Sequence, residues 1–197
     1  MEIILGHPVT DFDALAAQQA AARLYAGAIP VLARQLNENV AEFVGLYRDE
    51  LLFADADALP DEPVARVILV DTRRIWGHWR LAAETPVVVI DHHAGPETPA
   101  PHPATLLIEP CGATTTILAS RLLDAGAPIS PAEATLFLLG IYEDTGNLTF
   151  AGTTAADVRC AAGLLERGAD LGAVRRYGQR ALSTEQEAAY RALLPAL

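Results

Sequence analysis

The chain has 197 residues, of which 51% are hydrophobic and 20% charged, which is the balance of a soluble globular domain with a sizeable core rather than a disordered chain. Its formal net charge of -11 at pH 7 excludes a surface that attracts nucleic acid or anionic membrane as a whole, so a nucleic-acid substrate needs a local basic patch or metal ions. The lack of lysine excludes a lysine nucleophile, a Schiff base and a P-loop, and Cys111 and Cys160 form no Cys-x-x-Cys pair that would hold zinc.

Five short apolar runs predict the strands of a mostly parallel sheet. They are rich in Leu and in β-branched residues, and they are continuous rather than alternating, which is typical of strands buried on both faces. The predicted strands span residues 2–6, 29–33, 67–70, 87–90 and 106–109.

Helical patterns alternate with these strands and then fill the second half of the chain. The predicted helices between strands span residues 13–25, 39–47 and 74–83. The alternation predicts an α/β fold with a doubly wound five-stranded sheet and helices on both faces. Further on, helices are predicted over residues 114–125, from the capping box of Ser130 and Glu133 towards Tyr142, and over 154–167, ended by Gly168. Residues 54–62 and 94–103 are rich in Pro, Asp and Gly and predict surface loops.

The C-terminal end predicts a domain boundary. Residues 1–182 form the predicted domain, and a capping box that begins at Ser183 opens a last helix over 183–197. We interpret that helix as the start of a linker toward a further domain, and hence the chain as part of a longer protein. The apolar stretch 134–142 is far shorter than the roughly 20 residues of a membrane span. Without the basic start of a signal peptide, we expect a cytoplasmic protein with no membrane partner and with reduced thiols.

Acids and histidines follow four of the apolar segments. They are His7, Asp11 and Asp13 after the first, Asp71 after 67–70, Asp91, His92 and His93 after 87–90, and Asp144 after residues 134–142. Ligands of open α/β sheets bind outside the carboxyl ends of the strands, so these side chains can share one crevice. Clustered carboxylates repel one another unless a cation lies among them. The sequence therefore predicts a site for divalent metal ions.

Each residue of this set also has a purely structural interpretation. Asp13, Asp71 and Asp91 can cap helices, and Asp144 can belong to a turn. Consecutive histidines at a strand end are harder to explain in this way, and four such coincidences at once are improbable.

Three other groups of residues keep two interpretations. Residues 112–116 can approach a phosphate or form a plain helix cap. For the arginine groups 73, 74, 80 and 175, 176, 180 we favour solvated helix faces over phosphate binding. For Trp76 and Trp79 we favour packing over stacking on a base.

The motifs resemble those of the DHH phosphoesterases. His7-x-x-x-Asp11-x-Asp13, Asp71 after a strand, Asp91-His92-His93 and Asp144-Thr145-Gly146 stand in the order of the four family motifs. The segments 109–116 and 140–150 are most similar to the N-terminal DHH domain of bacterial proteins that continue with a second DHH-associated domain, CBS domains and a tRNA nucleotidyltransferase (poly(A) polymerase-like) domain.

The resemblance implies two Mn²⁺ ions, with Mg²⁺ as a substitute. His7 and Asp11 are then expected to bind the first ion, Asp13, His92 and Asp144 the second, and Asp71 both. Asp91 is expected to orient the histidine pair, and His93 to face the substrate phosphate, so that Asp71, Asp91 and His93 are the expected catalytic set. Carboxylate and imidazole ligands without thiolate suit Mn²⁺.

The resemblance also implies the substrate. We expect hydrolysis of phosphoester bonds in nucleotides or short oligonucleotides, with RNA or tRNA as the partner of a larger protein. Two alternatives stay open: a metal- or nucleotide-binding regulatory module without catalysis, and a pyrophosphatase of the family II type. The sequence departs from the family in one respect, since it holds no Gly-Gly pair of the substrate-gripping motif that the family's second domain carries.

Overall fold

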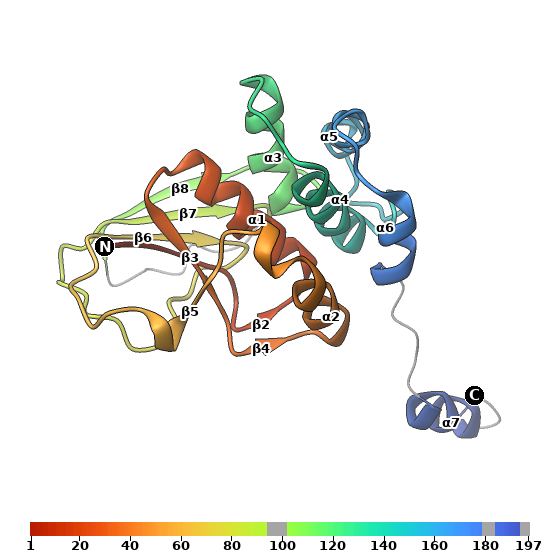
Figure 1. The fold of residues 1–197 in the computed structure, drawn as a ribbon, viewed down its shortest axis with the longest axis horizontal. Coiled ribbons are helices and arrows are strands. Elements are labelled where there is room, and N and C mark those ends of the chain that lie inside the picture. Colours follow the sequence, from red (N-terminus) through yellow and green to blue (C-terminus); the bar gives the residue numbers. More distant parts are fainter. Residues whose placement is uncertain (94–101, 179–183, 194–197) are drawn as a thin grey trace.

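The computed structural model describes residues 1–93, 102–178 and 184–193. Its centre is a parallel sheet of six strands in the order β5-β3-β1-β6-β7-β8 (Figure 1). The strands are β1 (Glu2–Leu5), β3 (Ala28–Leu32), β5 (Ala54–Asp55), β6 (Arg66–Val70), β7 (Val87–Asp91) and β8 (Ala104–Ile108). The α/β class and the five predicted strands are confirmed.

The strand order creates a switch point between β1 and β6. From β1 the chain proceeds to β3 and β5 on one side, and it later returns to place β6, β7 and β8 on the other side. At such a point the connections diverge from neighbouring strands and leave a crevice outside their carboxyl ends. His7 follows β1 and Asp71 follows β6, so both lie at this crevice.

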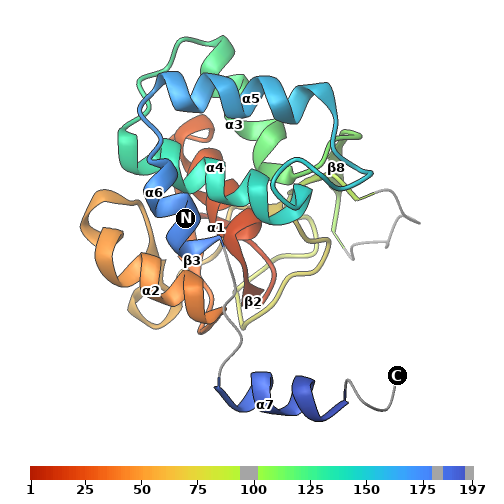
Figure 2. The ribbon, with the colours of Figure 1, turned by 90° about the vertical axis from the view of Figure 1, so that its right-hand side faces the viewer.

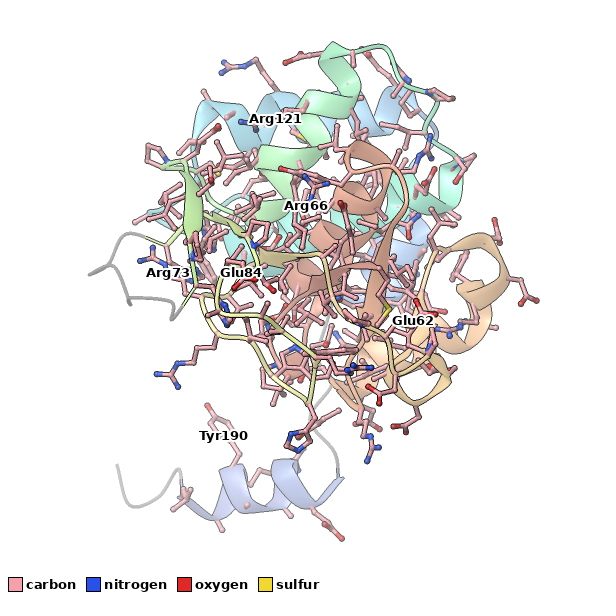
Figure 3. All side chains as sticks on the ribbon, turned by 90° about the vertical axis from the view of Figure 1, so that its left-hand side faces the viewer. Glu62, Arg66, Arg73, Glu84, Arg121 and Tyr190 are labelled. Atoms are coloured by element: carbon pink, nitrogen blue, oxygen red, sulfur yellow. The ribbon has the colours of Figure 1, made fainter. Side chains whose placement is uncertain are left out.

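The helices form a layer on one face of the sheet and extend into the C-terminal part. They are α1 (Phe12–Leu24), α2 (Glu38–Tyr47), α3 (Thr114–Asp124), α4 (Pro131–Thr145), α5 (Ala155–Glu166), α6 (Leu171–Tyr177) and α7 (Thr184–Leu193). Helix α4 contacts α1, α3, α5 and α6, and Figure 2 shows it among them. Helix α7 lies apart, and its Tyr190 is exposed (Figure 3).

Local sequence explains where the predicted helices begin and end. The capping box of Ser130 and Glu133 starts α4, as predicted, and Gly146 ends it in the left-handed conformation at φ 55°. A second capping box, of Thr154 and Asp157, starts α5. The helical C-terminal part is therefore confirmed, with α6 as an element that the sequence pattern did not predict. The capping box predicted at Ser183 lies outside the described residues.

Alternate side chains of the strands supply two apolar cores. Ile4, Ile68 and Ile90 face the helices, whereas Ile3, Val67 and Val89 face the opposite side. That second face is covered by residues around Leu59 and by the segment between β6 and β7, without an α-helix among the described residues that pack there.

Three expectations about this fold need correction. The helix predicted over residues 74–83 is wrong, because that segment runs irregularly over the second face, turns at Gly77 (φ 82°) and buries parts of Trp76 and Trp79. The sequence predicts α-helices on both faces of the sheet. In the described segments the second face has no α-helix and carries only the 3-10 helix η2 (Ala56–Ala58). The sheet has a sixth strand, β5, which is too short to give an apolar pattern and lies in the predicted loop 54–62.

The remaining elements are short. Strands β2 (Val9–Thr10) and β4 (Gln35–Leu36) pair in parallel beside the sheet, and the 3-10 helix η1 (Arg48–Glu50) follows α2. Most of the predicted loop 94–103 lies outside the described residues. Cys111 and Cys160 are both free thiols. Among the helices that the structure describes, none has the length and apolarity that crossing a membrane would require.

Candidate metal centre

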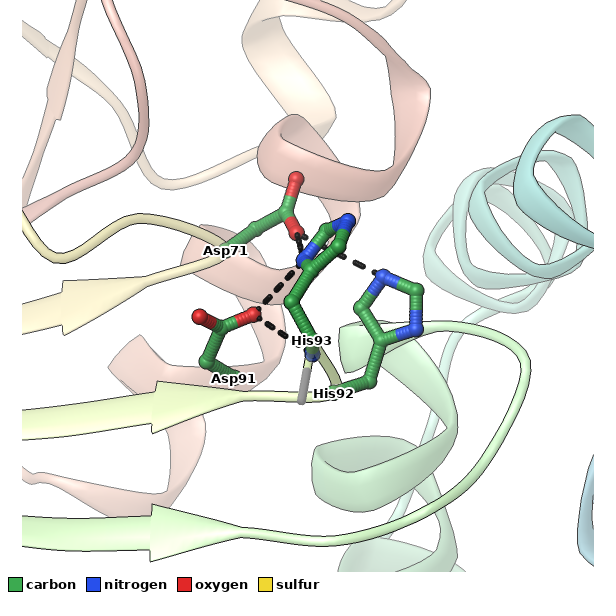
Figure 4. Close-up of side chains that lie close together, drawn as sticks. All are labelled: Asp71, Asp91, His92 and His93. Carbon is green, nitrogen blue, oxygen red and sulfur yellow. Dashed lines mark hydrogen bonds and ion pairs between the residues drawn. The ribbon is translucent and has the colours of Figure 1, made fainter. Parts of the chain in front are cut away.

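The predicted acids and histidines meet at the carboxyl edge of the sheet. Three groups of side chains each hold their ligand atoms within 4.8 Å of one another: His7, Asp11 and Asp71; Asp13, Asp71, His92 and Asp144; and Asp71, Asp91, His92 and His93. Asp71 belongs to all three. Figure 4 shows Asp71 from the end of β6 meeting Asp91, His92 and His93 from the end of β7. The cluster is consistent with a metal site.

Asp71 owes its position to an unusual backbone. It follows β6 directly and has φ 54°, in the left-handed region that non-glycine residues rarely occupy. Its backbone N–H still donates to the Ile90 carbonyl of the neighbouring strand at 3.0 Å, and the Thr114 hydroxyl donates to its Oδ1 at 3.2 Å. Strain of this kind persists only where surrounding contacts impose it, and it is concentrated at functional sites.

His7 and Asp11 form one side of the cluster. Nε2 of His7 lies 3.3 Å from Oδ2 of Asp11 and 3.5 Å from Oδ2 of Asp71. Asp11 is also the N-cap of α1, since its Oδ1 accepts the N–H of Ala14 at 3.0 Å. Hydrogen bonding to Asp11 and then to Asp71 raises the pKa of His7 to about 10. A cation, whether a proton or a metal ion, is therefore strongly favoured at this position.

Asp13 is fully buried and holds a helix that is distant in sequence. It is the second residue of α1, but its carboxylate accepts the N–H groups of Thr114 and Thr115, both at 2.8 Å, at the start of α3. This contact changes both interpretations of residues 112–116. The amides of Thr114 and Thr115 bind a protein carboxylate rather than a phosphate, and the residue that caps α3 belongs to α1. Burial, and then the charges of Asp71 and Asp144, raise the pKa of Asp13.

His92 presents a ring nitrogen without a hydrogen-bond partner. Its Nδ1 lies 3.1 Å from the Cys111 carbonyl, and because a carbonyl only accepts, Nδ1 carries the proton. Its Nε2 is buried, makes no hydrogen bond within the described chain, and lies 3.1 Å from Oδ2 of Asp144 and 3.8 Å from Oδ1 of Asp71. A lone pair that faces carboxylates is stable only with a proton or a metal ion between them, so the residues present fit a metal ion that replaces the proton.

The charges around His92 favour the same conclusion. Burial lowers the pKa of His92, but the contact with Asp144 and the charge of Asp13 outweigh burial and raise it to about 9. Asp144 lies in the last turn of α4, where the negative end of the helix dipole disfavours a carboxylate. Burial also raises the pKa of Asp71. The hydrogen bond with His7 lowers it, and the charges of Asp11 and Asp144 raise it further.

Asp91 holds His93 in place rather than both histidines. Its Oδ1 accepts the backbone N–H of His93 at 3.1 Å and lies 2.8 Å from His93 Nδ1, while its Oδ2 accepts from Arg73 Nε at 3.1 Å. Burial alone would raise the pKa of Asp91, but these hydrogen bonds from His93 and Arg73 lower it. The side chain of His93 is 62% exposed, so it faces the open side of the cluster.

Several residues that support the cluster were not predicted from the sequence. Arg73, which we interpreted as part of a solvated helix face, binds Asp91 and also donates to the His93 carbonyl at 2.6 Å. Glu143 accepts the N–H of Phe12 at 2.6 Å at the start of α1. Asp157, fully buried, accepts the N–H of Gly112 at 2.9 Å and the hydroxyl of Thr116 at 2.6 Å, and so fixes the turn that carries the Cys111 carbonyl. Only its capping-box spacing with Thr154 signals Asp157 in the sequence.

Comparisons with known proteins agree with this arrangement. The profile of the DHH family, N-terminal domain, matches residues 2–141. The chain is 38% identical over 204 residues to an A-adding tRNA nucleotidyltransferase of Geobacter sulfurreducens, covering all of this chain and 23% of that protein. It is 34% identical over 176 residues to the protein of the same name from Aquifex aeolicus, covering 89% of this chain and 20% of that protein. The chain thus spans about a fifth of the length of these relatives.

Two solved structures share the fold. A candidate family II inorganic pyrophosphatase from Methanococcus jannaschii aligns with a TM-score of 0.66 at 22% identity, over 90% of this chain and 59% of that one. An exopolyphosphatase-related protein from Bacteroides fragilis aligns with a TM-score of 0.70 at 17% identity, over 98% of this chain and 60% of that one. At these identities the similarity shows the fold alone.

Proposed function

We propose, from the premise that this chain belongs to the DHH family and is homologous to the DHH region of A-adding tRNA nucleotidyltransferases, that it is a Mn²⁺-dependent phosphoesterase domain. Its proposed substrates are nucleotides or short oligonucleotides. DHH domains are generally metal-dependent phosphoesterases, and the chain has the cluster of Asp and His side chains that such chemistry needs.

The observation that carries this proposal is the buried, unpaired Nε2 of His92. It makes no hydrogen bond in the described chain, although it lies 3.1 Å from a carboxylate oxygen of Asp144 and 3.8 Å from one of Asp71. A structural interpretation would require an ordinary hydrogen bond at this atom. A metal ion satisfies both the imidazole lone pair and the neighbouring carboxylate oxygens.

The grouping of side chains supports two ions. His7 and Asp11 would hold the first ion, Asp13, His92 and Asp144 the second, and Asp71 would be shared. Oxygen and imidazole ligands favour Mn²⁺, with Mg²⁺ as the substitute. When bound, a pair of such ions lowers the pKa of water and neutralises the charge that develops on phosphate oxygens.

The chain's own residues position the substrate and the ligands. His93 is exposed beside the cluster, and Asp91 accepts a hydrogen bond from its Nδ1. That contact leaves the other ring nitrogen facing outward, where it donates to a phosphate oxygen when the ring carries both protons. Arg73 holds Asp91 and the His93 backbone, and Thr114 holds Asp71. Asp71, Asp91 and His93 are thus the proposed catalytic set, with Asp91 acting through His93.

The relatives support a place in RNA processing. They are named as A-adding tRNA nucleotidyltransferases, and the matched segments make up 23% and 20% of their lengths. We infer that residues 1–182 act as one domain of a larger protein of that kind, with tRNA or another RNA as its partner, and that 183–197 leads toward a further domain.

The same relatives favour one alternative. A domain attached to a nucleotidyltransferase can bind metal or nucleotide and regulate the attached enzyme without hydrolysing anything. The pyrophosphatase alternative has less support, because the similarity to the pyrophosphatase structure shows the fold alone.

Hydrolysis of a 5′-labelled short oligoribonucleotide with Mn²⁺ tests the proposal, with wild type compared with Asp71→Asn. We expect cleavage by the wild type and its loss in Asp71→Asn. Asp61→Asn is the control, since the Asp61 side chain is 88% exposed and belongs to none of the three groups of the cluster. Equal cleavage by wild type and Asp71→Asn would refute the proposal. Mn²⁺ binding without cleavage would favour the regulatory module, and faster release of phosphate from pyrophosphate would favour the pyrophosphatase.

A further inference from the structure

Both tryptophans of the chain line one cavity on the second face of the sheet. The chain contains two Trp, at positions 76 and 79, and they border a cavity of about 480 Å³. The cavity is also lined by Pro8, by Arg34 and Gln35 after β3, and by Asp57 of η2. No residue proposed above as a metal ligand lines it.

The indole rings are held so that they can offer a flat surface. Trp76 Nε1 donates to the Gly6 carbonyl and Trp79 Nε1 donates to the Trp76 carbonyl, both at 2.6 Å. The rings meet edge to face, with centroids 6.4 Å apart. Both pack against the second apolar core, as the packing interpretation predicted, yet both stay partly exposed toward the cavity. The polar atoms of the rings are satisfied, so the remaining contact they offer is through their π faces.

The cavity lies next to the metal centre. The Gly6 carbonyl that anchors Trp76 precedes His7, and Pro8, which forms a wall, follows His7. The cavity opens beyond the carboxyl end of β3, whose neighbour β1 leads into the centre. Because neighbouring strands lie about 4.8 Å apart, a ligand that extends over one or two strands reaches from one site to the other.

We propose that this cavity binds the base of a nucleotide whose phosphate lies at the Asp and His cluster, an inference that rests on the phosphoesterase function proposed above. Bases of every kind stack on aromatic side chains. Polar groups at the rim, from Arg34, Gln35 and Asp57, can hydrogen-bond to base edges, and Arg34 and Asp57 lie 2.6 Å apart as an exposed ion pair. The cavity thereby selects nucleotides over pyrophosphate and polyphosphate, which have no base.

Tryptophan fluorescence tests this inference directly, because Trp76 and Trp79 are the two tryptophans of the chain and both line the cavity. Adenosine, AMP and ribose 5-phosphate are titrated into the wild-type chain with Mg²⁺, which does not quench indole as Mn²⁺ does. We expect saturable quenching by AMP and adenosine and none by ribose 5-phosphate. Unchanged fluorescence with AMP, or equal quenching by ribose 5-phosphate, would overturn the inference.

Variants of Trp79 connect the cavity with turnover. Trp79→Leu removes the stacking surface and should raise KM for the dinucleotide pApA about tenfold, whereas Trp79→Phe restores an aromatic face and much of the affinity. Leu46→Ala changes another exposed apolar side chain, outside the cavity, and should leave KM unchanged. An unchanged KM in a folded Trp79→Leu would overturn the inference.

The failures of the two proposals are distinguishable. Cleavage that depends on Asp71 but leaves tryptophan fluorescence unchanged on AMP binding would keep the phosphoesterase and overturn the base site. Saturable quenching by adenosine without any cleavage would keep the base site and overturn the phosphoesterase.

Discussion

The carboxylate of Asp13 accepts the backbone N–H of Thr114 at 2.8 Å, across 101 residues of sequence. One fully buried acid thus caps α3 and also stands in the group with Asp71, His92 and Asp144. The positive N-terminus of α3 compensates part of its charge, and a metal ion would compensate the rest. The fold and the metal centre are therefore coupled through this residue.

Variants of Asp13 and Asp11 should separate the helix-capping role from the metal-binding role. Asp13→Ala leaves the buried N–H groups of Thr114 and Thr115 without acceptors and should cost about 1–2 kcal/mol of stability even without metal. Asp11→Asn should keep the cap of α1, because Asn caps as well as Asp does, so the metal-free variant should lose only the contact with His7, and it should lose Mn²⁺ affinity. Urea unfolding with a chelator, followed by Mn²⁺ titration, measures both effects. A metal-free Asp13→Ala as stable as wild type would refute the capping role.

Arg73 should matter to stability and Arg74 should not. The side chains of Arg73 and Asp91 are 15% and 4% exposed, so Arg73→Ala leaves a buried carboxylate with fewer donors, at a cost of roughly 2 kcal/mol. Exposed Arg74→Ala should change the free energy of unfolding by less than about 0.5 kcal/mol. Thermal melts of both variants check this, and equal effects would show that Asp91 does not depend on Arg73.

Gly140 fixes how closely α1 and α4 approach. A Cβ at this position would lie 2.7 Å from Thr115 Oγ1 and 2.9 Å from Ala16 Cβ. Gly140→Ala should therefore destabilise the chain by about 1–3 kcal/mol and weaken Mn²⁺ binding, because α4 carries Asp144. The control is Gly45→Ala in α2, where a Cβ meets nothing within 4 Å and the change should stabilise by about 0.5–1 kcal/mol. An unchanged free energy of unfolding in Gly140→Ala would mean that α1 and α4 can move apart at no cost.

The metal-free protein should lose stability as pH rises. The folded chain raises the pKa of His7 and His92 from 6.5 to about 10 and about 9, so it holds these protons more tightly than the unfolded chain does. That stabilisation is fully present below pH 6.5 and is lost as the pH passes through 9 and 10. The raised pKa values of Asp13 and Asp71 act in the same direction, because the folded chain also holds these protons more tightly than the unfolded chain does.

Thermal melts with a chelator at pH 6.5 and pH 10 measure this loss. His7→Gln should reduce the difference in melting temperature, while His78→Gln, an exposed residue outside the cluster, should leave it unchanged. Mn²⁺ should also reduce it, since the metal replaces the protons. A melting temperature that does not fall between the two pH values would contradict the pKa shifts of both histidines.

Local patterns predicted the elements that carry the cluster but not the contacts between them. The apolar runs before His7, Asp71 and Asp91 sufficed because parallel strands bring their carboxyl ends to one edge. The capping of α3 by Asp13 joins residues 101 apart, so no local signal reports it. The spacing of apolar residues in 74–83 fits a helix, but the segment instead packs its tryptophans against the second core of the sheet, a tertiary contact that overrides the local pattern.

Counting the Mn²⁺ ions that the chain binds tests the account most directly. Equilibrium dialysis with metal analysis should give two ions per wild-type chain and a loss of both tight sites in Asp71→Asn, because Asp71 belongs to every group of the cluster. A hundredfold excess of Mn²⁺ over its dissociation constant should also stabilise the wild type by about 2.7 kcal/mol for each site that it fills. No bound Mn²⁺ in the wild type, or equal binding by Asp71→Asn, would contradict the metal centre and with it the proposed chemistry.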